Sequence, residues 1–155
     1  MADVSRSLAV YLASLRWRKW KPGALDCGIF MSDWMVSRGA PDPMADIRGT
    51  YDSERKFLRI LRREGGFVNC CSARFGRIGM TETMSPKIGD LVAVTAPYAE
   101  RGGKIKRRPT GAIAISENMR VVATPDMGIV VVTSDHLPTL KAWTWNGCST
   151  WPSSS

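Results

Sequence analysis

Apolar side chains recur at helical spacing in the N-terminal half of the chain. Over residues 3–16 they fall three or four positions apart, which is typical of an amphipathic helix. A second helix is predicted from Asp26, as its N-cap, to about Arg38, where Gly39 follows. Its apolar side chains cover much of the circumference, so we expect this helix to be the buried one.

Two further helices are predicted before the pattern changes. The third begins at Asp52 or Ser53 and ends before Gly65–Gly66, and a short fourth covers Asn69 to Phe75. One side of the third helix is apolar and the other side is basic. We interpret the basic side as a solvated face rather than a nucleic-acid surface, because that is the usual meaning of such spacing. It carries Arg55, Arg59, Arg62 and Arg63.

Short strand-like runs follow Gly89–Asp90. Helices first and strands second indicate an α+β domain, with an antiparallel sheet packed against the helical half. The connection between the first two strands, PYAERGGKIKRRPT, is expected to be a polar, basic loop over residues 97–110. Strands are expected over residues 91–96, 111–116, 120–124, 128–133 and 140–145.

Length and composition fit a single domain with its own core. The chain has 155 residues, of which 44% are hydrophobic and 23% charged. We expect one domain over residues 1–146 and a flexible or partner-ordered tail over 147–155. No apolar run approaches the roughly 20 residues that span a bilayer. The first 20 residues are typical of a helix rather than a signal peptide, so the expected compartment of synthesis and assembly is a reducing cytoplasm.

The chain is strongly basic. Its net charge of +8 and pI of about 9.7 indicate an acidic partner: nucleic acid, an anionic cell-wall polymer or an acidic neighbour in an assembly. No nucleic-acid recognition motif accompanies the charge, so nucleic acid is the least favoured of the three. The clearest basic cluster lies in the predicted loop beside Gly102–Gly103 and is a candidate partner-contact site. It consists of Arg101, Lys104, Lys106, Arg107 and Arg108.

Four cysteines and one histidine do not form a metal-binding pattern. There is no CxxC pair, and adjacent Cys70 and Cys71 would need ligands from elsewhere to hold a metal. We therefore expect no metal and no cofactor, and interpret the thiols as mostly buried.

Cys27 is the one cysteine at a position with chemical meaning. It directly follows the predicted N-cap, Asp26, where unpaired backbone N–H groups and the helix dipole favour a thiolate. A strand packed against that helix could present a general base to the sulfur, and a third polar group could orient the base. The alternative is that Cys27 is a small buried residue retained because it packs well.

The segment DCGIFMSDWM resembles the DC-x-x-F motif of NlpC-type cysteine peptidases, which are papain-like enzymes of the bacterial cell wall. A longer string resembles a branch of that superfamily borne by tailed phages and prophages, and the likeness covers roughly residues 8–146. IGDLVAV (88–94) and AWTW (142–145) also match. The other matching residues are Trp20, Pro22, Gly23, Asp26, Cys27, Trp34, Gly39, Asp42, Pro43, Arg48, Gly49, Tyr51, Gly65 and Gly66.

The resemblance implies a papain-like fold in which Cys27 is the nucleophile, but the other catalytic members do not match. The family's catalytic histidine lies in a strand of the form GHVGI, and here TGAIAIS puts Ala112 in its place. The residue that orients the ring falls near Ala123, which has no side-chain dipole. The resemblance therefore implies a catalytically degenerate domain.

His136 is the alternative base. It follows Cys27 in chain order and lies after the strand of residues 128–133, in TSDHLP. Asp135 is a poor orienter for it, because adjacent side chains on an extended chain point to opposite sides.

Two functions follow from these observations. The first is a structural component of a tailed-phage virion, at the distal tail tip, which contacts other tail-tip or hub proteins in several copies around the tail axis. The second is an active peptidoglycan peptidase that assists DNA entry, with Cys27 as nucleophile and His136 as base.

Overall fold

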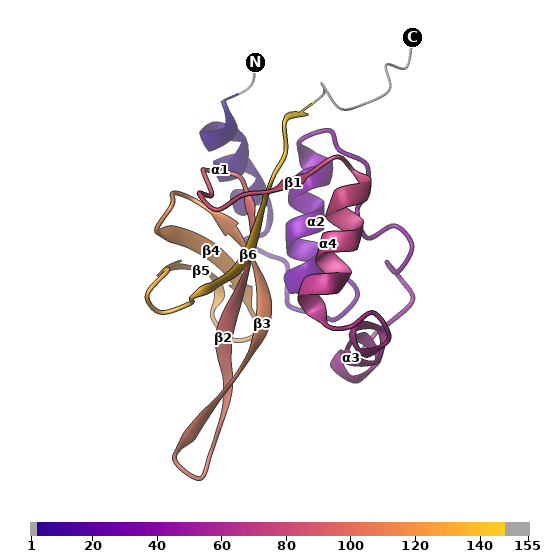
Figure 1. The fold of residues 1–155 in the computed structure, drawn as a ribbon, viewed down its shortest axis with the longest axis vertical. Coiled ribbons are helices and arrows are strands. Elements are labelled where there is room, and N and C mark those ends of the chain that lie inside the picture. Colours follow the sequence, from indigo (N-terminus) through magenta and orange to yellow (C-terminus); the bar gives the residue numbers. More distant parts are fainter. Residues whose placement is uncertain (1–2, 148–155) are drawn as a thin grey trace.

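The computed structural model describes residues 3–147, and these residues confirm the α+β class. Four helices precede a six-stranded antiparallel sheet of order β1-β6-β2-β3-β4-β5 (Figure 1). The predicted tail lies, apart from Gly147, outside the described residues. The helices are α1 (Val4–Ser14), α2 (Cys27–Ser37), α3 (Glu54–Arg63) and α4 (Phe67–Arg77). The strands are β1 (Thr81–Glu82), β2 (Leu91–Arg101), β3 (Lys104–Ala114), β4 (Met119–Thr124), β5 (Gly128–Thr133) and β6 (Thr139–Thr144).

The helix boundaries follow from their caps. The Asp26 carboxylate accepts a hydrogen bond from the Ile29 N–H at 2.9 Å, which confirms the predicted start of α2. Ser53 caps α3 by accepting from the Lys56 N–H. The prediction for α4 was too short, because the helix begins directly after Gly66, whose φ of 108° suits glycine.

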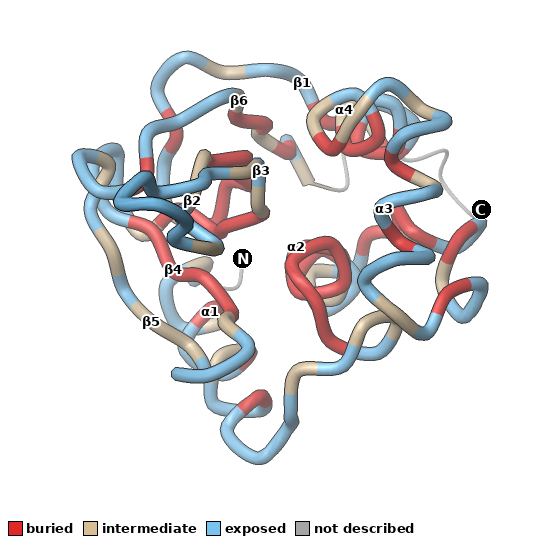
Figure 2. Tube along the Cα trace, turned by 90° about the horizontal axis from the view of Figure 1, so that it is seen from below, coloured by how far each residue is buried: buried red, intermediate tan, exposed pale blue. Residues whose placement is uncertain are grey.

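Two hydrophobic clusters lie on opposite faces of the sheet. The larger one joins the helices to the inward side chains of the strands, including Leu91, Ile113 and Val121. In Figure 2, α2 is buried along most of its length. The smaller cluster lies on the other face and includes Val92 and Val122. Alternate residues of one strand therefore belong to different clusters, as the pleat requires.

The segment 97–110, predicted to be a loop, is mostly strand. β2 and β3 pair from Leu91↔Ile113 out to Arg101↔Lys104. Gly102 and Gly103 close this hairpin with φ values of 60° and 76°, the pair of positive angles that a tight type I′ turn needs. The outer ends of these strands have no core face and so no apolar alternation, which is why their sequence predicts a loop.

β3 and β4 separate soon after they meet. They pair only at Ile113↔Val121 and Ala114↔Arg120, whereas β4 and β5 pair along six residues. The side of β3 that faces β4 is therefore unpaired before Ile113. This unpaired edge lies next to the N-terminus of α2.

Candidate functional site

Asp26 and Cys27 lie at the N-terminus of α2, and the Asp26 carboxylate accepts three hydrogen bonds that hold this end of the helix. Besides capping Ile29, its carboxylate accepts from the Gly23 N–H at 2.9 Å and from the Tyr51 hydroxyl at 2.6 Å. Burial, reinforced by the neighbouring carboxylate, raises the pKa of Tyr51, so its hydroxyl stays protonated as a donor. Asp26 is therefore a structural anchor for the loop that leads into Cys27.

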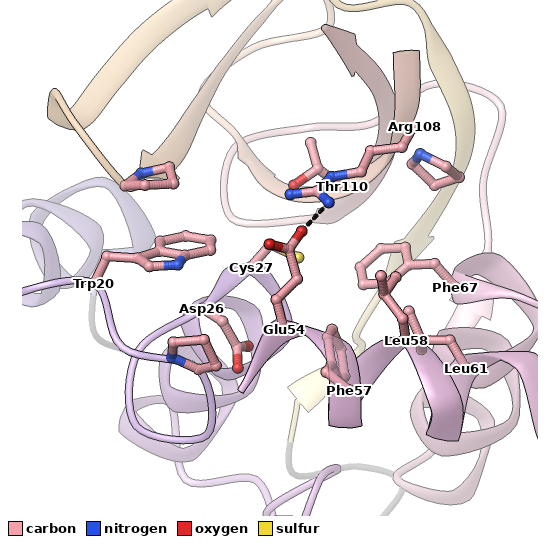
Figure 3. Close-up of a pocket in the computed structure, with 13 residues that line it drawn as sticks. Trp20, Asp26, Cys27, Glu54, Phe57, Leu58, Leu61, Phe67, Arg108 and Thr110 are labelled. Carbon is pink, nitrogen blue, oxygen red and sulfur yellow. Dashed lines mark hydrogen bonds and ion pairs between the residues drawn. The ribbon is translucent and has the colours of Figure 1, made fainter. Parts of the chain in front are cut away.

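A pocket of about 90 Å³ lies beside Cys27, where β3 and β4 separate. Its walls are mostly apolar, and Figure 3 shows Trp20 on one side and Phe67 on the other. An ion pair between Glu54 of α3 and Arg108 of β3 joins the helical and sheet walls. The lining consists of Trp20, Pro22, Asp26, Cys27, Glu54, Phe57, Leu58, Leu61, Phe67, Arg108, Pro109, Thr110 and Pro125.

The Cys27 thiol is held in its neutral form. Burial raises its pKa above the ordinary value of 9.0, and the negative charge of Asp26 raises it further. A hydrogen bond with the Thr110 side chain, one with the Gly111 backbone and the charge of Arg108 oppose this rise without cancelling it. Burial and the charge of Asp26 thus act against the stabilisation of a thiolate that is expected at a helix N-terminus.

The residue of β3 that faces α2 is Gly111, not Ala112. Cys27 belongs to the cluster between helices and sheet, whereas Ala112 belongs to the cluster on the opposite face. Ala112, the residue that the resemblance puts in the place of the histidine, therefore points away from Cys27, because neighbouring residues of a strand face opposite sides. Ala123, the position assigned to the orienting residue, does lie in the cluster with Cys27.

Gly111 leaves no room for a side chain. A Cβ atom at this position would lie 2.7 Å from the carbonyl oxygen of Cys27 and still closer to the methyl group of Met31. Real Cβ atoms do not approach other atoms this closely, so α2 would have to shift to admit even an alanine. Position 111 therefore cannot carry a base, and the β3 side chain that does reach the Cys27 sulfur is that of Thr110, which is not a base.

His136 lies apart from the pocket. It is exposed in the turn after β5, where its Nδ1 is 2.9 Å from the Thr133 hydroxyl oxygen and its carbonyl accepts from Arg107. Its neighbour Leu137 packs in the cluster on the sheet face away from Cys27. Within the described part of the chain, no imidazole lines the pocket beside Cys27.

The five cations of the predicted contact loop divide into two groups. Arg108 pairs with Glu54 and lies over the Tyr98 ring at 4.9 Å, and Arg107 donates to the Thr95 carbonyl at 3.1 Å. These two arginines hold the base of the hairpin. Arg101, Lys104 and Lys106 are exposed near its turn.

Sequence reasoning missed Thr110, Gly111 and Glu54 as parts of this site. Glycine inside a strand pattern is a recognised sign that another backbone comes close, and Gly111 carries that sign. Thr110 could have followed from correct placement of Gly111. Glu54 had no signal, since its role depends on where α3 lies relative to β3.

Cys70 and Cys71, the other cysteines within the described residues, are both buried. Burial raises the pKa of Cys70 to about 11 and that of Cys71 well above its ordinary value. Among residues 3–147, no group of three or more histidine, cysteine or acidic side chains is placed to hold a metal ion. No helix in the same range is long and apolar enough to cross a membrane.

Comparison with known proteins gives one match. Neither the curated proteins nor the solved structures include a significant match. One family model, described as "Domain of unknown function (DUF6950)", matches residues 1–144, nearly the whole chain. The chain therefore belongs to the DUF6950 family.

Proposed function

We propose that this protein is a non-catalytic structural component of a tailed-phage virion, at the distal tail tip, built on a degenerate papain-like fold of the NlpC type. The resemblance of the DC-x-x-F segment and the longer motif string supports the phage setting. The chemistry around Cys27 supports the loss of catalysis. In this proposal the domain is a rigid body whose surfaces bind neighbouring tail proteins.

The observation that carries the proposal is that β3 presents only Thr110 and Gly111 to Cys27, neither of which is a base. A cysteine peptidase needs a base to ionise the thiol and then an acid to protonate the leaving amine. Here the facing residue is Gly111, and a Cβ there would collide with α2. The thiol itself is buried and neutral.

The expected loss of rate is large. General acid–base assistance typically contributes about 10²–10⁴-fold, and removing a triad member costs about 10⁴-fold or more in well-studied hydrolases. The raised pKa of Cys27 lowers the thiolate fraction further. A peptidase with these deficits would turn over too slowly to help DNA cross an envelope during infection.

A peptidoglycan zymogram tests the loss of catalysis. We expect no clearing from the wild-type chain and none from Cys27→Ala, with Cys70→Ala as a control for loss of a buried thiol elsewhere. Clearing by the wild type that disappears only in Cys27→Ala would overturn the proposal.

Immunogold electron microscopy tests the location. Antibodies against this chain should label phage particles at the end of the tail. Labelling of the host cytoplasm or wall, with unlabelled particles, would contradict a virion component.

One feature favours the rival function, an active peptidase. Cys27 begins a helix beside a pocket, and the Thr110 side chain and Gly111 backbone form hydrogen bonds with its sulfur. These groups could stabilise developing negative charge but do not provide a base. His136 would have to reach the pocket from the far side of the sheet, so an active peptidase requires a rearrangement of the chain. Clearing in the zymogram would be the evidence for such an activity.

A further inference from the structure

The outer part of the β2–β3 hairpin is an arm that extends beyond the rest of the molecule. We define the arm as residues 97–108, which project past the sheet as two strands and a turn (Figure 1). A bulge at Tyr98, between Pro97 and Ala99, marks its base. A two-stranded hairpin alone is marginally stable in water. Contact with another surface would therefore stabilise the arm.

The cations near the turn share one face of the arm. Arg101 and Lys104 are direct cross-strand partners, so their side chains lie on the same side. Lys106 is two residues beyond Lys104 and returns to that side. Within residues 3–147 none of these three side chains forms an ion pair or a side-chain hydrogen bond. Like charges directly opposite each other destabilise a hairpin, so the free arm carries a repulsion that an anionic partner would relieve.

The rest of the arm is suited to a protein surface. Glu100 faces Ile105 on the side away from the three cations, and Ile105 is 62% exposed. Tyr98 is 53% exposed at the base of the arm. Exposed aromatic and aliphatic side chains beside cations are typical of protein interfaces.

We propose that the arm is a docking element whose cationic face, formed by Arg101, Lys104 and Lys106, binds an acidic surface on another protein. The inference deepens the proposed function by naming the chemistry of the partner, and it rests on that function only for its virion setting. The predicted contact cluster of five cations is thereby reduced to three, because Arg107 and Arg108 form hydrogen bonds or ion pairs within the molecule.

The first experiment measures binding of a fluorescent poly-L-glutamate peptide by anisotropy at low and physiological salt. Replacing Arg101, Lys104 and Lys106 together by glutamine should weaken binding about tenfold, as three partly screened charge pairs would. The matched control replaces Arg55, Arg59 and Arg62 of α3 by glutamine, which removes the same charge from another exposed face. The control should lose less than threefold.

The second experiment separates charge from folding of the arm. Arg101→Glu would place an opposite charge across from Lys104, so hydrogen exchange of amides 99–106 should slow in the free protein. The same variant should bind poly-L-glutamate at least tenfold more weakly. Faster exchange in this variant would contradict the cross-strand repulsion on which the inference depends.

Two results would overturn the inference. Equal losses in the arm and α3 variants would show that binding follows total charge alone. Tighter binding of a 20-base-pair DNA than of poly-L-glutamate, lost in the arm variant, would assign the arm to nucleic acid. Neither binding result would change the interpretation of the zymogram, and clearing in the zymogram would not change the interpretation of the binding experiments. The proposed function and the proposed docking arm can therefore be disproved independently.

Discussion

At the scale of single residues, Gly111 decides what the site can do. Its missing side chain lets β3 lie against the first turn of α2, where Cys27 and Met31 leave no free volume. Cys27 is consequently buried among apolar groups and remains protonated. The close approach of β3 to α2 at Gly111 therefore contributes both to the burial of Cys27 and to its neutral state.

Gly111→Ala should destabilise the fold. Overpacking of this kind typically costs about 1–3 kcal/mol, because the backbone or Met31 must move. Urea unfolding measures the effect. Gly76→Ala is the matched control, since nothing lies within 4 Å of a Cβ at that helical position. The control should be neutral or stabilising by about 0.5–1 kcal/mol. A neutral Gly111→Ala would contradict the close approach of α2 and β3.

Buried Cys70 should make stability fall at alkaline pH. Burial raises its pKa from 9.0 to about 11 in the folded chain. Between these two values the unfolded chain has lost a proton that the folded chain keeps, so the free energy of unfolding declines as pH rises. Relative to Cys70→Ala, the wild type should lose about 1.4 kcal/mol per pH unit in this window. The gap between the two proteins, measured by urea unfolding, should be constant from pH 7 to 8. A gap that stays constant up to pH 11 would show that the thiol ionises normally.

At the scale of elements, the start of α2 depends on one carboxylate. Asp26 caps the helix and also accepts from Gly23 and Tyr51, which ties the preceding loop and the chain before α3 to the same point. The Tyr51 ring in turn stacks on Phe57 of α3 at 4.6 Å. Asp26 and Tyr51 thus help to fix the position of α2 relative to α3.

Asp26→Ala should cost about 3 kcal/mol. Loss of an N-cap accounts for about 1 kcal/mol, and the buried donors of Tyr51 and Gly23 left without an acceptor account for the remainder. Ser53→Ala removes only a cap, that of α3, and should cost about 1 kcal/mol in the same thermal or urea unfolding assay. Equal effects would mean that the Tyr51 and Gly23 contacts contribute nothing.

The elements differ in how far sequence could predict them. Helices α1 to α3 were predictable because each combines apolar spacing with a capping residue, as at Asp26 and Ser53. The outer strands of the arm were not, because neither face of residues 97–108 is buried in a core. Of the site, the position of Cys27 at the start of α2 was predictable from the sequence. The groups of β3 beside it were predictable only in part: Gly111 carries a sign of close approach, but the face of each residue depends on strand register, which the three-dimensional packing fixes.

At the scale of the whole molecule, a packed body and a projecting arm perform separate tasks. The two hydrophobic clusters lie within the body, and residues 97–107 are almost all exposed. The arm therefore adds little apolar burial to the domain, and in our proposal its role is to contact a partner.

Shortening the arm tests this division. Replacing residues 98–106 by Asn-Gly would join Pro97 to its cross-strand partner Arg107 through a tight turn. The free energy of unfolding should change by less than about 1 kcal/mol, as for surface changes away from a core. Iodoacetamide labelling of Cys27 should stay slow. Unfolding of the shortened protein would show that arm and body form one cooperative unit.

The collision at Gly111 also bears on how such a site could change over generations. An imidazole cannot be added at position 111 by a single substitution, because any side chain there meets Met31 and the carbonyl oxygen of Cys27 first. A smaller residue at position 31, or a displaced helix, would have to come earlier. Hydrolysis assisted by a base at position 111 would thus require an ordered pair of steps, the first of which opens a void in the interior and brings no activity.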